Sequence, residues 1–318
     1  MRFRVLALLG ALMFAAAALA PATGSASGTS GPCGQLKGVG SYDHVVVIMD
    51  ENVAYSTLRD SAQAPYLHTL GSQCGTETNM HAATHPSQPN YMAATSGHAT
   101  GSGAYTVNDN VFHQAQVVGD RWAAYQESMP SACSGSRSPY LKGHNPPFCY
   151  TDLASPKNTC ALYDVPSSPA LDDAIYHDSL PALSWVTPDA CHDMHWVQGC
   201  SQPYSKRISA GDTWLSRLVP RLTALPSYAA GKTLVLITWD EGDGASTDGV
   251  DCTRSSVYTS QPSCDIPTIV VSPYVVPGTV DHADRNLYGL LGDVEDILGY
   301  PRLGRAVGQS SPRPGLGF

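Results

Sequence analysis

Three short stretches of the chain carry oxygen-bearing side chains of the kinds that bind hard metal ions or act as nucleophiles. Glu51 and Asn52 follow one apolar run, Asp240 and Glu241 follow another, and Ser87 lies between them in the stretch Thr-His-Pro-Ser-Gln-Pro-Asn. Carboxylate and amide oxygens are preferred ligands of hard divalent cations, and a cation beside a serine hydroxyl can activate that serine as a nucleophile. The combination predicts metal-assisted phosphoryl transfer. Its expected metal-binding residues are Glu51, Asn52, Ser87, Asp240 and Glu241.

The elements around these residues explain how they would meet. The continuous, β-branched runs at 44–50 and 233–239 predict buried strands, and Glu51 and Asp240 come directly after them. Ligands of open α/β sheets bind at the carboxyl ends of strands. Pro89 predicts the start of a short helix over 90–96 that ends at Gly97. Ser87 would then lie at a helix N-terminus, where backbone N–H groups and the helix dipole favour an anion.

Strands and helices are expected to alternate along the rest of the chain. The patterns predict further strands at 183–187 and 266–272, and core-facing positions at Trp122 and Tyr125. Asp212 is expected to cap an amphipathic helix that runs to about Leu222 and is interrupted near Pro220. Apolar residues at helical spacing predict a helix over 287–298, ended by Gly299. This alternation predicts a layered α/β fold.

The first 26 residues have the pattern of a secretory signal peptide. Arg2 and Arg4 precede an apolar run from Val5 to Ala20, and small residues place cleavage near Ala26. The mature chain is therefore expected to be secreted. No other run is long and apolar enough to span a bilayer, so no stable membrane insertion is expected. The expected organisation is a flexible lead-in at 27–40, a single catalytic domain at 41–306 and a flexible tail at 307–318.

The charge balance of the chain excludes some classes of partner. Without the signal peptide, 16 basic and 27 acidic side chains remain, for a net charge of −11. Nucleic-acid-binding surfaces need clustered Lys and Arg, so no nucleic-acid partner is expected. Docking on an anionic membrane is disfavoured for the same reason.

Nine cysteines in an exported chain indicate disulfides. The closely spaced pairs Cys191/Cys200 and Cys252/Cys264 predict bridged loops. Cys160 is expected to pair with Cys133 or with Cys149. The odd number of cysteines leaves one thiol without an intramolecular partner.

Six motifs occur in one order: DENVAYSTL, THPSQPNYMAATSG, KGHNP, TPDACHDMH, ITWDEG and DHADRNLYGLLGDVEDILGYPRLGRA. Together they resemble the secreted phosphoesterase family that includes bacterial phospholipases C and acid phosphatases, within the alkaline-phosphatase-like superfamily. The resemblance covers roughly residues 43–306. It implies a three-layer α/β sandwich with a central mixed, mostly parallel sheet flanked by helices.

The resemblance also implies roles for single residues. Glu51 with Asn52 and Asp240 with Glu241 match the two metal-binding pairs, and Ser87 matches the nucleophile. Three histidines match catalytic positions near the phosphate: His144, His195 and His282. One divalent metal ion is the expected cofactor. A second ion is possible in the region of Asp189, Asp193, His195 and His282.

The expected function is a phosphomonoesterase of the acid-phosphatase type that hydrolyses phosphate esters through a phosphoserine. The alternative is a phospholipase C that releases phosphorylated headgroups. Such enzymes tend to be longer, and the few Trp and Phe residues of this chain are scattered, which favours a soluble ester. Thr84 is the rival nucleophile. A ligand-binding module without activity would lack metal ligands, and none is missing. Sulfatase chemistry needs an Arg that residues 87–91 do not contain.

Overall fold

The computed structural model describes residues 31–101, 106–153, 160–195, 197, 199–200, 203–244, 248–309 and 313–318. The predicted signal peptide and residues 27–30 of the predicted lead-in lie outside the described residues. In the described part of the chain, no helix is both long and apolar enough to cross a membrane.

One mixed sheet forms the centre of the molecule. Its strand order is β4-β3-β5-β1-β6-β7-β2-β8, and β9 also pairs with β2. Every described pairing is parallel except the two made by β7, with β6 and with β2. The strands are β1 (His44–Asp50), β2 (Gly75–His81), β3 (Trp122–Gln126), β4 (Asp164–Pro166), β5 (Leu183–Thr187), β6 (Thr233–Trp239), β7 (Asp265–Val271), β8 (Thr279–Asp281) and β9 (Arg285–Asn286).

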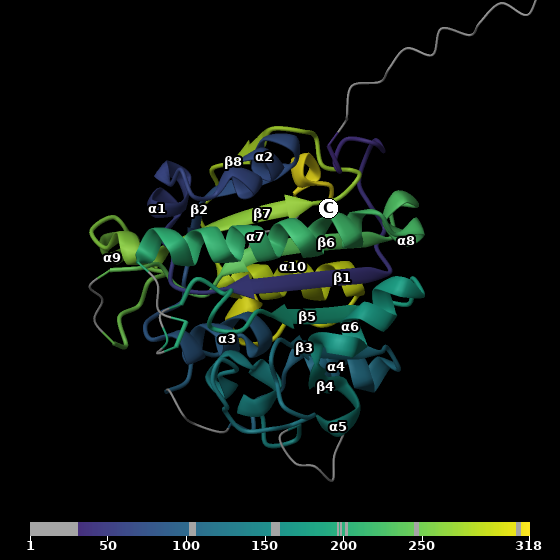
Figure 1. Ribbon diagram of the computed structural model, residues 1–318, viewed down its shortest axis with the longest axis horizontal. Coiled ribbons are helices and arrows are strands. Elements are labelled where there is room, and N and C mark those ends of the chain that lie inside the picture. Colours follow the sequence, from purple (N-terminus) through teal and green to yellow (C-terminus); the bar gives the residue numbers. More distant parts are fainter. Residues whose placement is uncertain are drawn as a thin grey trace, which may run out of the picture.

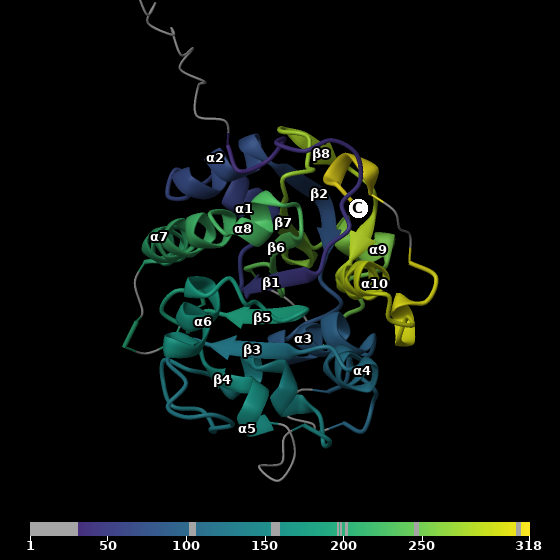
Figure 2. The same cartoon turned by 90° about the vertical axis from the view of Figure 1, so that its right-hand side faces the viewer.

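Helices cover both faces of this sheet. Figures 1 and 2 show α1, α2, α7 and α8 on one face, and α3, α4 and α10 on the other. The predicted three-layer sandwich with a mostly parallel sheet is therefore confirmed. The helices are α1 (Tyr55–Asp60), α2 (Pro65–Gln73), α3 (Ser87–Ser96), α4 (Val111–Val118), α5 (Cys160–Tyr163), α6 (Ser167–Tyr176), α7 (Tyr204–Thr223), α8 (Pro226–Ala229), α9 (Ser255–Tyr258) and α10 (Leu287–Leu298).

The predicted strands and the C-terminal helix form where expected, whereas two helices start earlier than predicted. Helix α3 begins at Ser87, because a proline is tolerated in the first turn, where no N–H is needed. Helix α7 begins at Tyr204 and continues through Pro220. Asp212 therefore does not cap it. Its carboxylate instead accepts hydrogen bonds from the backbone N–H groups of Tyr66 and Leu67 in the first turn of α2, at 3.2 and 2.9 Å.

The described parts of the predicted lead-in and tail are joined to the domain at several points. Cys33 is disulfide-bonded to Cys74, and the backbone N–H of Leu36 donates to Pro273. The N–H of Gly40 donates to the carbonyl of Gly317 at 2.8 Å. Composition indicated a flexible segment because Gly, Ser and Pro are common in loops. Long-range contacts of this kind leave no local pattern.

Four disulfides are present among the described residues. They join Cys33 to Cys74, Cys133 to Cys160, Cys191 to Cys200 and Cys252 to Cys264. Both predicted short-range pairs are confirmed, and Cys160 pairs with Cys133. Cys149 is buried and has no disulfide partner.

A buried ionic cluster ties the tail to the sheet. The guanidinium of Arg313 contacts Glu77 on β2 and Asp293 on α10, and all three side chains are nearly inaccessible to solvent. Breaking a buried pair by removing one partner leaves a charge without compensation, which typically costs about 3–5 kcal/mol.

We expect Arg313→Ala to lower the free energy of unfolding by about 3–5 kcal/mol, measured by urea denaturation. Arg221→Ala is the matched control, because Arg221 pairs with Asp172 at 2.8 Å on the exposed surface. Exposed ion pairs contribute roughly 0–1 kcal/mol. Equal losses in the two variants would contradict the structural role assigned to Arg313.

Candidate active site

Two predicted metal-binding pairs emerge side by side from the centre of the sheet. Strands β1 and β6 are parallel neighbours with Asp50 opposite Trp239, so Glu51 and Asp240 leave the sheet together. The backbone N–H of Asn52 donates to Asp240 Oδ1 at 3.3 Å. Asn52 has a φ of 51°, a left-handed conformation that Asn adopts more readily than most residues. This turn brings the two strand ends into contact.

Ser87 lies directly between the two pairs. Its Oγ is 3.0 Å from Glu51 Oε2 and 3.0 Å from Glu241 Oε1. Ser87 is also the first residue of α3, whose ten residues begin after an extended Pro86. The structure therefore brings together the three segments that the sequence singled out, at the N-terminus of a helix.

The loop before Ser87 is held by one side chain of the same helix. Asn90 Oδ1 accepts hydrogen bonds from the backbone N–H groups of Ala83 and Thr84, both at 2.9 Å. Asn90 Nδ2 donates to the carbonyl of Thr84 at 2.8 Å. The hydroxyl of Thr84 donates to the carbonyl of His85 at 3.2 Å. The geometry therefore places Ser87, and not its rival Thr84, beside the carboxylates.

Acidic side chains are concentrated in this site. Burial raises the pKa of Glu51 well above its ordinary value, and repulsion from Asp193 and Glu241 adds to the shift. Burial also raises the pKa of Asp240, with further repulsion from Glu51 and Glu241. Asp240 Oδ2 is buried and accepts no hydrogen bond from the described residues. Hard oxygen donors, buried acidic charge and an unsatisfied carboxylate oxygen together fit a divalent cation.

His144 links Glu51 to a third acidic residue. It ends the 3-10 helix η1 (Lys142–His144), with its Nε2 3.2 Å from Glu51 Oε1 and its Nδ1 3.2 Å from Asp193 Oδ2. Burial lowers the pKa of His144 to about 4. Near neutral pH the ring therefore has a single N–H proton, which can serve only one of the two carboxylates. The ring is hydrogen-bonded to Asp193 through Nδ1, whereas Glu51 Oε1 accepts no hydrogen bond from the described residues. This geometry suits positioning of Asp193 better than proton donation.

His195 is the second predicted histidine that lies at the site. Its ring centroid is 5.4 Å from that of His144, and its backbone N–H donates to Asp193 Oδ1 at 2.7 Å. Potential ligand atoms of Glu51, His144 and His195 all lie within 4.8 Å of one another. His195 is half-buried, so its ring borders both the carboxylate cluster and solvent.

His282, the third predicted histidine, lies elsewhere. It follows the edge strand β8, and its Nδ1 is 2.6 Å from the hydroxyl of Thr78. Three strand positions separate β8 from β6 and four separate it from β1, the two strands whose ends carry the site. At about 4.8 Å per position this is roughly 14–19 Å. Each motif predicted its own histidine, but the motifs could not show how far apart their strands lie in the sheet.

The region suggested for a second metal ion is therefore not assembled. Asp189 accepts hydrogen bonds from Ser128 Oγ at 2.5 Å and from the backbone N–H of Cys191 at 2.9 Å. Asp193 is used by His144 and by the backbone of His195. With His282 at the far edge, the four residues do not surround a common point.

Glu127, Asp189 and His192 form another cluster with potential metal ligands. The carboxylate of Glu127 already accepts hydrogen bonds from Trp214 Nε1 at 3.0 Å and from the backbone N–H of Asp189 at 2.9 Å. It also lies 3.0 Å from His192 Nδ1, and this contact raises the pKa of His192. These contacts tie the loop that carries Asp193 to Glu127 and Trp214.

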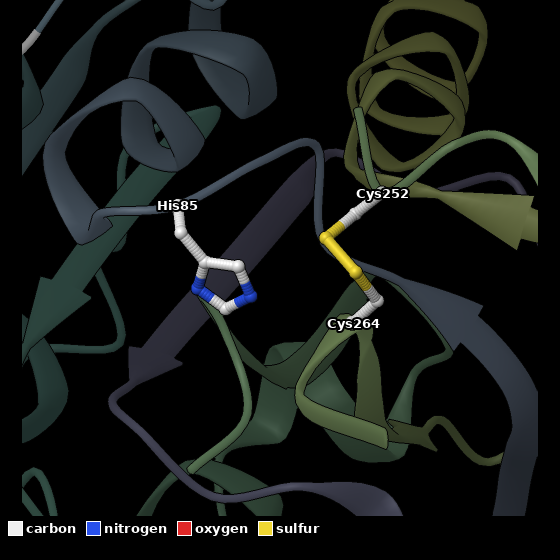
Figure 3. Close-up of side chains that lie close together, drawn as sticks. All are labelled: His85, Cys252 and Cys264. Carbon is white, nitrogen blue, oxygen red and sulfur yellow. A yellow bond between two sulfur atoms is a disulfide. The ribbon is translucent and has the colours of Figure 1, made fainter. Parts of the chain in front are cut away.

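Sequence reasoning overlooked two side chains of the site. Tyr91 is fully buried, and its ring lies parallel to that of His144, with centroids 5.6 Å apart. It follows Ser87 by one helical turn, and that spacing alone predicts a shared helix face. The second is His85, which has its Nδ1 2.5 Å from Glu241 Oε2 and packs beside the Cys252–Cys264 disulfide (Figure 3).

Solved structures with the same architecture define the class of the fold. A protein in the alkaline phosphatase superfamily from Vibrio parahaemolyticus superposes with a TM-score of 0.58 at 14% identity, covering 88% of this chain and 74% of that one. The phosphonate monoester hydrolase of Agrobacterium radiobacter gives a TM-score of 0.56 at 12% identity, covering 86% and 78%. The chain therefore has an alkaline-phosphatase-like fold.

The chain belongs to the Phosphoesterase family, which matches residues 58–300, and it is a phosphoric ester hydrolase. It is 28% identical over 316 residues to a phosphatidylinositol-3-phosphatase of Mycobacterium tuberculosis, covering 96% of this chain and 91% of the relative. It is 27% identical over 290 residues to an acid phosphatase of Aspergillus fumigatus. That alignment covers 86% of this chain, which spans 58% of the length of the Aspergillus protein.

Proposed function

We propose that the protein is an exported, metal-dependent phosphomonoesterase in which Ser87 is the nucleophile and becomes transiently phosphorylated. The observation that carries this proposal is the position of Ser87 Oγ, 3.0 Å from a carboxylate oxygen of Glu51 and 3.0 Å from one of Glu241, at the N-terminus of α3. An anionic phosphate is favoured at such a helix end.

The first half of the reaction follows from these contacts. Ser87 Oγ forms a bond to phosphorus, and the bond between phosphorus and the leaving oxygen of the ester breaks. The hydroxyl proton of Ser87 passes to one of the two carboxylates that it contacts. His195 borders solvent at the site and donates a proton to the leaving oxygen. Water then hydrolyses the phosphoserine and releases phosphate.

The metal ligands in this proposal are Glu51, Asn52, Asp240, Glu241 and Ser87. When bound, a divalent cation supplies positive charge that favours the alkoxide form of a serine and neutralises phosphate oxygens. Buried carboxylates that raise one another's pKa are unfavourable without such a charge. The acidic site thus supports a metal-dependent enzyme.

The names of the relatives support phosphomonoesters as substrates. One relative is named a phosphatidylinositol-3-phosphatase, and several others are named acid phosphatases. Export is supported by the four disulfides, which persist in oxidising compartments, and by the predicted signal peptide.

A panel of four substrates tests the proposal on the purified mature chain. They are p-nitrophenyl phosphate, bis-p-nitrophenyl phosphate, phosphatidylinositol 3-phosphate and phosphatidylcholine. We expect hydrolysis of the two monoesters, loss of activity after chelation, and recovery when Mg²⁺, Ca²⁺ or Mn²⁺ is added back. Release of phosphocholine as the main activity would instead identify a phospholipase C. Full activity in chain shown by elemental analysis to be metal-free would contradict metal dependence.

A further inference from the structure

Glu241 is shared between Ser87 and a histidine outside the predicted catalytic set. One carboxylate oxygen, Oε1, is 3.0 Å from Ser87 Oγ, and the other, Oε2, is 2.5 Å from His85 Nδ1. Both Glu241 and His85 are buried, with 6% and 2% of their surfaces exposed. Water is therefore largely excluded from this contact.

The opposite edge of the His85 ring has no hydrogen-bonding partner. His85 Nε2 is buried and makes no hydrogen bond with the described residues. Figure 3 shows this edge of the ring turned toward the Cys252–Cys264 disulfide, and a ring nitrogen of His85 lies within 4.8 Å of both sulfur atoms. Sulfur is a weak acceptor, so a proton on Nε2 would be a buried donor without a good partner.

This asymmetry selects one tautomer of the ring. A proton on Nδ1 is hydrogen-bonded to a carboxylate, whereas a proton on Nε2 would be unsatisfied. His85 therefore donates its Nδ1–H to Glu241 Oε2. The disulfide contributes because it forms an apolar surface beside Nε2 that contains no good hydrogen-bond acceptor.

The backbone around His85 is held on both sides by the segment that contains this disulfide. The N–H of Gly249 donates to the carbonyl of His85 at 2.7 Å, and the N–H of Cys252 donates to the carbonyl of Ala83 at 3.1 Å. The N–H of Ala82 donates to the carbonyl of Cys264 at 2.9 Å. These bonds hold the ring at a defined place relative to the end of β6.

We propose that His85 is a positioning residue that occupies one oxygen of Glu241 with its Nδ1–H and so directs the other oxygen to the metal ion and Ser87. The inference rests on the proposed function, since it assigns Glu241 to the metal site. Hydrogen-bonded partners of metal ligands typically contribute about 10–100-fold to metal affinity.

Three substitutions separate this role from simple packing. In His85→Asn the amide nitrogen can take the place of Nδ1, in His85→Gln it reaches toward the place of Nε2, and His85→Leu has no donor. We expect His85→Asn to bind Mn²⁺ within about threefold of the unaltered chain, and His85→Gln and His85→Leu to bind it about 10–100-fold more weakly. Calorimetric titration of the metal-free proteins with Mn²⁺ gives the affinities, and His177→Asn is the exposed control.

The position of the proton on the His85 ring can also be measured directly in the unaltered protein, so this test does not depend on the folding of a variant. Long-range ¹⁵N–¹H NMR spectra of the unaltered protein should show His85 with its proton on Nδ1. A proton on Nε2 would overturn the inference, as would equal Mn²⁺ affinities in His85→Asn, His85→Gln and His85→Leu. If the unaltered chain binds no divalent ion at all, the proposed function itself fails. The NMR result would then still decide the tautomer.

Discussion

Replacing Ser87 by Ala should lower the turnover of a phosphomonoester by roughly 10³-fold or more, because the substitution removes the nucleophile and not merely a binding contact. Ser87 is only partly buried, and its Oγ lies 3.0 Å from a carboxylate oxygen of Glu51 and 3.0 Å from one of Glu241. The fold should therefore survive the change. Turnover is measured on p-nitrophenyl phosphate, and the melting temperature verifies folding.

Thr84→Ala is the matched control for this prediction, because it removes a hydroxyl three residues away that donates to a backbone carbonyl. Its turnover should remain within about tenfold of the unaltered chain. Acid quenching with ³²P-labelled substrate should leave phosphate on the peptide that contains Ser87. Label on Thr84 would make Thr84 the nucleophile, and near-normal turnover in Ser87→Ala with no labelled residue would replace the phosphoserine mechanism by direct attack of water.

Asp240→Asn should remove metal binding and most activity while leaving the metal-free fold at least as stable as before. Substituting a residue that is hydrogen-bonded to a metal ligand typically weakens metal binding about 10–100-fold. Loss of a carboxylate that binds the metal directly should weaken it by more than that. In the metal-free chain, burial and neighbouring carboxylates raise the pKa of Asp240. The folded state therefore binds the proton more tightly than the unfolded state. Stability of the unaltered metal-free chain should fall as pH rises above about 4.

Thermal melts with and without metal test this prediction. The unaltered chain should gain about 2.7 kcal/mol at a metal concentration 100 times its Kd, and Asp240→Asn should gain much less at the same concentration. Exposed Asp172 provides the control substitution Asp172→Asn, which should keep the full gain. An unchanged metal response in Asp240→Asn would show that Asp240 is not a ligand.

Sequence reasoning identified the central strands because burial on both faces demands continuous apolar residues. Val45 to Met49 are completely buried, and no residue of β6 has more than 1% of its surface exposed. The chemistry at their carboxyl ends followed from parallel pairing, which places Glu51 beside Asp240. Ser87 was recognisable because its motif lies at a helix start.

Other features depend on contacts between distant parts of the chain, and these leave no local signal. His282 stands in a motif that resembles a catalytic one, yet strand order places it at the sheet edge. Asp212 has the sequence pattern of a cap for its own helix but caps α2 instead. His85 depends on a disulfide between Cys252 and Cys264 that brings an apolar wall to its ring.

The contact between Glu77 and Arg313 can form only late in synthesis, after Arg313 has been added to the chain. These residues are 236 positions apart, and a ribosome adds roughly 5–20 residues per second. Arg313 is therefore synthesised on the order of 12–47 s after Glu77. Until then β2 and α10 cannot pack together without burying unpaired carboxylates. In a nascent chain of this protein, the packing of β2 against α10 should therefore remain incomplete until Arg313 has been translated.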